Sequence, residues 1–172
     1  MLFKLTEKEE TSRDVIWVLA DSFNDLPEEA RDLLFKLAEK EDTSRDVANA
    51  VAYNFDKLPE EERNKLLLKL AEKEETSRDV AGIVAYNFNK LPGEVRDELL
   101  LKLSENDKAA GIVAWTVVDI FNNLPGEVRN KLLLKLSEKE EAVWDVARIV
   151  RDNFDKIPEE VREQLPEKVR RR

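Results

Sequence analysis

The sequence predicts an all-α protein, an α-solenoid of about five helix-turn-helix repeats of about 33 residues each, with about eleven helices. Three observations predict this class: a Leu-Pro or Ile-Pro step returns at a nearly fixed period, leucines recur at helical spacing, and no segment alternates as a strand does. The recurring prolines are Pro27, Pro59, Pro92, Pro125 and Pro158. Helix pairs repeated at this period stack because each pair has an apolar face that only a neighbouring pair can cover.

The first helix of each repeat is typified by PEEERNKLLLKLAEK, which starts at Pro59. Proline at the first helical position and acids in the first turn indicate the start of a helix. Leu66, Leu67 and Leu70 recur on one face and predict its buried side. The copy that starts at Pro27 is one residue shorter, so we expect an altered first turn there.

The second helix of each repeat follows an acidic turn. Thr76 and Ser77 offer hydroxyl groups as caps for its start, and we expect it to end near Phe88. On a helical wheel Val80 and Val84 share one side with Phe88 and barely vary between repeats, so this side is the predicted core.

A column of asparagines stands at the edge of that core side. We expect these amides to bond the loop backbone near the following Leu-Pro, because a buried amide needs hydrogen-bond partners. The column consists of Asn54, Asn87 and Asn153.

The repeats are expected to form one domain over residues 1–172. Met1 to Leu5 aligns with Leu33 to Leu37, so the chain begins within a repeat, and Pro166 is expected to interrupt its last helix. The predicted segments are a partial repeat 1–25, repeats 26–57, 58–90, 91–123 and 124–156, and a capping helix 157–172.

This repeat pattern resembles HEAT repeats, with armadillo repeats as the alternative. The resemblance is carried by Pro59 opening the first helix, the LLLKL run from Leu66, the acidic turn and the SRDVA segment from Ser77. It implies that the second helices line the concave side of a solenoid. SRDVA, LPGEVR and LLLKL also return unchanged, which resembles an artificial, consensus-designed array, although recent duplication gives the same uniformity.

Composition excludes several kinds of chemistry. The 172 residues include no cysteine and no histidine, which removes thiol nucleophiles, disulfides, imidazole bases and nearly all transition-metal sites. No catalytic carboxylate pair or phosphate-binding glycine loop is found, so we expect no enzyme, cofactor or metal. The net charge of -9 disfavours nucleic acid.

The run from Ala109 to Val118 is too short to cross a bilayer. There is no basic and apolar leader. We therefore expect no membrane partner and a soluble protein, cytoplasmic if natural and recombinant if artificial.

The positions of the second helices that face away from the core vary strongly between repeats. All three tryptophans and both tyrosines fall on this side, and Gly82 and Gly111 occupy it although glycine costs about 1 kcal/mol in a helix. The helix that begins at Ala109 is the most apolar, with Ile120 among its apolar residues, and Gly111 is expected to leave the ring of Trp115 free. The candidate partner-binding residues are Trp17, Asn49, Tyr53, Gly82, Tyr86, Gly111, Ile112, Trp115, Val118, Asp119, Trp144, Arg148 and Arg151.

Three functions follow as hypotheses. The first is a non-enzymatic scaffold that binds a protein or peptide through the variable face, because clustered exposed aromatics typify interaction sites. The second is a structural repeat design without a natural partner, in which the aromatics are incidental or mediate self-association as a homo-oligomer. The third is an alkylated-base DNA glycosylase, an enzyme class known on HEAT-like repeats, which the acidic charge opposes.

Overall fold

The computed structural model describes residues 9–170, which form eleven α-helices and contain no strand, and this confirms the predicted all-α class. The predicted helix over Met1 to Leu5 lies outside the described residues. The count of eleven arises because Pro166 divides the last helix into α10 and α11. The α-helices are α1 (Glu9–Asp21), α2 (Glu28–Glu39), α3 (Glu41–Tyr53), α4 (Glu60–Leu70), α5 (Glu74–Tyr86), α6 (Gly93–Leu103), α7 (Asp107–Ile120), α8 (Gly126–Ser137), α9 (Val143–Asp152), α10 (Glu159–Gln164) and α11 (Glu167–Arg170). Short 3₁₀ helices are η2 (Phe23–Asp25), η3 (Phe88–Lys90), η4 (Phe121–Asn123), η5 (Glu140–Ala142) and η6 (Phe154–Lys156).

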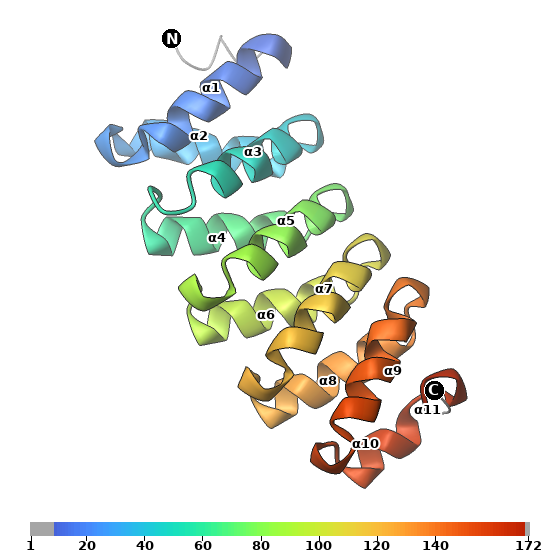
Figure 1. Ribbon diagram of the computed structural model, residues 1–172. Coiled ribbons are helices and arrows are strands. Elements are labelled where there is room, and N and C mark those ends of the chain that lie inside the picture. Colours follow the sequence, from blue (N-terminus) through green and yellow to red (C-terminus); the bar gives the residue numbers. More distant parts are fainter. Residues whose placement is uncertain (1–8, 171–172) are drawn as a thin grey trace. The chain divides into compact units, whose positions relative to one another are not determined.

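The chain divides into two compact units, Met1–Val80 and Ala81–Arg172, with the boundary inside α5. Within the first unit α1 packs beside α3 and α2 beside α4, so the first and second helices of the repeats form separate layers (Figure 1). The second unit has the same arrangement, with α6 beside α8 and α7 beside α9. Each unit is therefore a helical repeat array, whereas a single domain over the whole chain stays a prediction.

The core lies between the two layers of each unit. Leu66, Leu67 and Leu70 of α4 are completely buried, and Val80 and Val84 of α5 are too. Phe88, just beyond α5, exposes 7% of its surface. The predicted phase of both helices is therefore confirmed.

The helices of the first layer begin one residue later than predicted. Pro59 is the N-cap of α4, and its carbonyl accepts a hydrogen bond from the backbone N–H of Arg63 at 2.9 Å. In the shorter repeat the Pro27 carbonyl accepts from both Ala30 and Arg31, at 3.0 and 3.2 Å. The Pro158 carbonyl also accepts from two N–H groups, those of Val161 and Arg162, both at 3.1 Å, so this geometry is not specific to the shorter repeat. The expected effect of the missing residue on the first turn stays a prediction.

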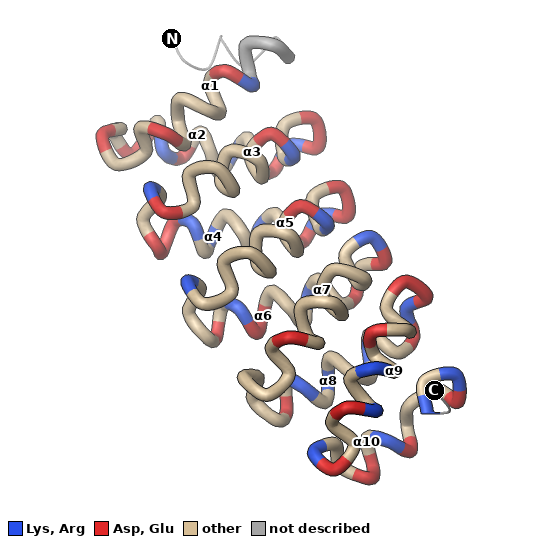
Figure 2. The backbone as a smooth tube through the Cα atoms, viewed as in Figure 1, with Lys and Arg blue, Asp and Glu red and all other residues tan. Residues whose placement is uncertain are grey.

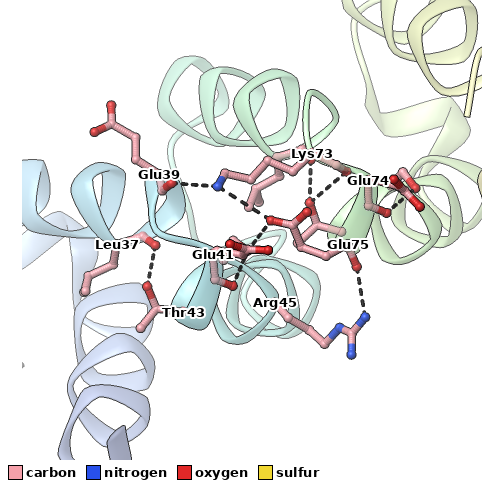
Figure 3. Close-up of polar contacts among 12 residues, drawn as sticks. Leu37, Glu39, Glu41, Thr43, Arg45, Lys73, Glu74 and Glu75 are labelled. Carbon is pink, nitrogen blue, oxygen red and sulfur yellow. Dashed lines mark hydrogen bonds and ion pairs between the residues drawn. The ribbon is translucent and has the colours of Figure 1, made fainter. Parts of the chain in front are cut away.

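Threonines at the turn between the layers do not act as N-caps, contrary to our expectation. Because α5 already begins at Glu74, Thr76 lies inside its first turn, and its hydroxyl donates to the Leu70 carbonyl at 2.5 Å. Thr43 donates in the same way to Leu37 at 2.6 Å (Figure 3). Ser77 also donates, to the Glu74 carbonyl at 2.9 Å. The two threonine hydroxyls therefore join the end of one helix to the start of the next, at carbonyls of a helix end, whereas the Ser77 bond stays within α5.

The asparagine column also bonds differently from the expectation. Asn54 Nδ2 donates to the Ala50 carbonyl at 3.1 Å, and Asn87 repeats this contact to Ile83 at 3.0 Å. Asn153 donates to Ile149 at 3.1 Å. Each amide therefore donates to the last turn of its own helix and not to the loop backbone.

Lysines link consecutive repeats at the turn between the first and the second helix of a repeat. Lys69 Nζ donates to the Glu39 carboxylate, and Lys73 Nζ donates to the Glu39 backbone carbonyl at 2.6 Å (Figure 3). The second unit repeats the arrangement with Lys135 and Lys139 on Glu105. The hydrogen bond and charge of the neighbouring lysine lower the pKa of Glu39 and of Glu105.

We expect the protein to lose stability as the pH falls from about 4.5 through the lower folded-state pKa of Glu39 and Glu105. A carboxyl group whose pKa is lower when folded stabilises the fold above its unfolded pKa, and protonation removes that contribution. Denaturant melts give the free energy of unfolding at about pH 7 and about pH 3. The difference between these two values should be smaller in the double variant Glu39→Gln and Glu105→Gln than in the native protein. Glu94→Gln is the control, because exposed Glu94 forms no ion pair within residues 9–170. An unchanged difference in the double variant would contradict the role of the two linkages.

An arginine stacks on a phenylalanine in every repeat, a feature that the sequence reasoning missed. The guanidinium carbon of Arg63 lies 4.2 Å from the Phe55 ring centre, and that of Arg96 lies 4.3 Å from Phe88. The other three pairs are Arg31 with Phe23, Arg129 with Phe121 and Arg162 with Phe154. Burial lowers the pKa of Arg63 because the charged guanidinium loses solvation.

The pairing of this arginine differs between repeats. Arg96 Nε donates to Asp97 Oδ1 at 2.9 Å. At the equivalent positions Arg63 Nε and Asn64 Oδ1 are both buried without a hydrogen-bond partner. An asparagine therefore leaves a donor and an acceptor unused where an aspartate forms a charge-assisted bond.

We expect Asn64→Asp to raise the free energy of unfolding by about 1 kcal/mol, because it gives the buried Arg63 the carboxylate that Arg96 has. Asp97→Asn should lower it by a similar amount, and denaturant melts measure both. A destabilising Asn64→Asp would show that desolvation of the new charge exceeds the gain from pairing.

Candidate functional site

Large aromatic side chains of the second-layer helices lie on the surface, as their place on the helical wheel predicts. The exposed fractions are 76% for Tyr53, 93% for Tyr86, 57% for Trp115 and 70% for Trp144. Trp17 is half-buried. Four of the five large aromatics therefore contribute little to the core of their unit.

In the first unit α1 and α3 bring together three candidate residues. The rings of Trp17 and Tyr53 meet edge to face, with centroids 5.4 Å apart and an interplanar angle of 73°. Asn49, which is exposed, lines the same shallow pocket as the two rings. We call Trp17, Asn49 and Tyr53 the α1/α3 patch.

In the second unit α7 presents a mixed surface, and its middle carries no charge (Figure 2). Trp115 and Asp119 are exposed, whereas Ile112 and Val118 are half-buried. Ile120 exposes only 9% and belongs to the core, so its place in the apolar face of α7 does not make it part of the site. Tyr86 and the half-buried Gly82 lie on the part of α5 that belongs to this unit.

On α9, Trp144, Arg148 and Arg151 line one surface pocket, with Asp145 and Ala147. Arg151 Nε donates to Asp152 Oδ1 at 2.8 Å, and Arg148 Nε lies 3.9 Å from the other carboxylate oxygen. The hydrogen bond from Arg151 lowers the pKa of Asp152, and the charge of Arg148 adds to this effect. Both guanidinium groups are more than half exposed and keep free donors for a ligand.

Gly111 is not the open position we expected, because it lies against the next repeat. A Cβ atom there would lie 3.5 Å from both the Cβ and the carbonyl oxygen of Glu141, because η5 packs against α7. The exposure of Trp115 therefore cannot be explained by open space at Gly111. The relevant neighbour comes from the next repeat, so inspection of one helix could not identify it.

Gly82, in contrast, lies beside open space, and a Cβ atom built there meets nothing within 4 Å. We expect Gly82→Ala to raise the free energy of unfolding by about 0.5 to 1 kcal/mol, the usual gain in helix propensity. Gly111→Ala is the comparison and should gain at least as much, because its methyl group would add an ordinary van der Waals contact with Glu141 at 3.5 Å. Denaturant melts that show Gly82→Ala to be destabilising would contradict the open space at this position.

One column of variable positions, which begins with Arg13 and Arg45, also helps to hold the scaffold together. The sequence did not predict this role. Arg13 Nε donates to Asp46 Oδ1 at 3.1 Å, and Arg45 donates to the Glu75 carbonyl at 3.0 Å (Figure 3). Arg45 Nε also lies 3.5 Å from Asp79. Variation at these two positions is therefore coupled to the next repeat, since Arg13 and Arg45 pair with residues one repeat further on.

Within residues 9–170 there is no group of three or more acidic residues placed to hold a metal ion. None of the described helices combines the length and the apolar character needed to cross a bilayer. Comparisons with protein families, with curated proteins and with solved structures gave no match. The candidate site is therefore assessed from its own geometry.

Proposed function

We propose that the protein is a non-enzymatic scaffold that binds a protein or peptide through the variable face of its second-layer helices. The observation that carries the proposal is the contrast between the constant, buried positions and the variable, exposed positions of these helices. In α3, α5, α7 and α9 the positions equivalent to Val80 and Val84 are apolar and buried, while Tyr53, Tyr86, Trp115 and Trp144 are more than half exposed. Aromatic side chains of this size supply large contact areas at low entropic cost, which supports an interface role.

The scaffold itself is proposed to be HEAT-like, because Pro59 and its equivalents begin the first helix and SRDVA lies in the second helix of a repeat. The verbatim repetition of whole segments favours an artificial or selected array. Such an array keeps core positions constant and varies the surface, which agrees with the exposure of the varied aromatic positions.

A selection from a displayed peptide library tests the proposal. Peptides that bind the native protein are expected to lose affinity for a variant with Tyr53, Tyr86, Trp115 and Trp144 all changed to Ala. The matched control carries four substitutions to Ala on exposed positions of the first-layer helices, Glu61, Glu94, Glu127 and Lys131. This control should keep its ligands, because none of these side chains lies on a second-layer helix.

Two results would contradict the proposal. Selected peptides that bind the aromatic variant as well as the native protein would locate binding elsewhere. If light scattering after size-exclusion chromatography shows an oligomer that only the aromatic variant breaks, the aromatic face mediates self-association, which is the alternative function.

A further inference from the structure

The α1/α3 patch combines two aromatic faces with neutral polar groups. Trp17 and Tyr53 meet at an interplanar angle of 73°, so their rings form two walls of a corner. Tyr53 exposes 76% of its surface, and Asn49 and Ala52 line the same pocket. A flat apolar ring from a ligand therefore has two faces to pack against.

The charges at this pocket are already paired. Arg13 and Asp46, its two charged lining residues, form an ion pair at 3.1 Å. Within residues 13–170 the indole N–H of Trp17, the hydroxyl of Tyr53 and the amide of Asn49 make no hydrogen bond. All three groups are uncharged, and each can donate a hydrogen bond. The patch therefore favours an uncharged ligand that supplies hydrogen-bond acceptors.

We propose that the α1/α3 patch binds a proline-rich segment in the polyproline II conformation. Proline rings pack against aromatic faces, and proline carbonyls accept hydrogen bonds while the residue itself has no N–H to satisfy. The polyproline II conformation is formed before binding, so ordering costs little entropy. This inference rests on the proposed function and names the class of partner for one part of that face.

Other peptide modes fit this patch less well. Addition of a strand requires an exposed strand edge, and residues 9–170 contain no strand. A helix bound in a groove needs a continuous apolar stripe, whereas among the described residues only Trp17, Ala52 and Tyr53 are apolar and line this pocket. A charged peptide would have to compete with the ion pair of Arg13 and Asp46.

The test is titration of the native protein with an oligoproline peptide of about ten residues, with a glycine-serine peptide of equal length as the ligand control. Calorimetry measures the affinity, and NMR follows the three indole N–H signals. We expect binding of oligoproline alone, with the Trp17 signal shifting most. Tyr53→Ala should weaken binding about tenfold or more.

Trp17→Phe assigns the indole signal and, by removing the N–H, should weaken binding about threefold to tenfold. Val18→Ala is the matched control, because Val18 is next to Trp17, exposes 60% and does not line the pocket. It should bind oligoproline as the native protein does. If Val18→Ala weakens binding as much as Tyr53→Ala, general apolar exposure explains the interaction and the proposal is wrong.

Absence of oligoproline binding, or equal binding of the glycine-serine peptide, would also overturn the inference. Binding of a soluble oligosaccharide to the same residues in place of oligoproline would overturn it as well, since aromatic rings also stack on sugars. The proposed function is judged separately, by the library-selected peptides. Those peptides can remain sensitive to the aromatic substitutions even if oligoproline does not bind.

Discussion

Phe88→Ala is expected to lower the free energy of unfolding by about 3 to 5 kcal/mol, as for other buried phenylalanines. The side chain exposes only 7%, and its ring lies 4.3 Å from the guanidinium carbon of Arg96. Truncation removes the apolar contacts of the ring and leaves Arg96 without the surface on which it stacks. Denaturant melts followed by circular dichroism measure the change.

The matched control for this substitution is Phe154→Ala in the same unit. Phe154 holds the equivalent place and stacks with Arg162 at 3.9 Å, but it exposes 52% of its surface. Phe154→Ala should lower the free energy of unfolding by less than half as much as Phe88→Ala, because less apolar area returns to water. A loss below about 1 kcal/mol for Phe88→Ala would show that the core face of the second helices has been misassigned.

Trp115→Ala is expected to weaken binding of a library-selected ligand by about 2 kcal/mol, or roughly thirtyfold, while leaving folding nearly unchanged. Trp115 exposes 57%, and within the described residues its ring makes no aromatic pair and its indole no hydrogen bond. The energy of an interface concentrates in a few large anchors, and Trp115 stands on the uncharged part of α7. Calorimetric titration of the two proteins with the same ligand gives the difference.

Two companion substitutions refine this result. Trp115→Phe should recover part of the affinity if ring area is the main contribution. Arg148→Ala should matter chiefly for ligands that carry a carboxylate, since a guanidinium group gains most from a charged partner. Unchanged binding by Trp115→Ala, or unfolding of that variant, would contradict the assignment of Trp115 to a binding surface.

Much of the fold could be predicted because the repeat presents the same local pattern several times. The leucines around Leu67 and the valines around Val84 have a helical period, and period alone decides which side of an isolated helix is apolar. The exposure of Tyr53 and Trp144 follows from the same phase. These features depend on residues within one helix, so a sequence read one helix at a time contains them.

Hydrogen-bond partners were less predictable, because they depend on the exact start of a helix. Thr76 was expected to accept a hydrogen bond as a cap, but α5 begins two residues earlier and its hydroxyl donates to Leu70. Asn54 was expected to bond a loop, but it donates to the carbonyl four residues before it. A shift of one or two residues at a helix end is enough to exchange donor and acceptor roles.

The sequence by itself determined the all-α class, the repeat period, the core side of each helix and the outward placement of the large aromatics, because these follow from spacing along the chain. Only the tertiary structure decided that Arg63 stacks on Phe55, that Glu141 covers Gly111 and that Trp17 meets Tyr53. Each of these contacts joins different helices or turns, from eight to more than thirty residues apart in the sequence. Their geometry depends on how neighbouring elements pack, which no single-helix period specifies.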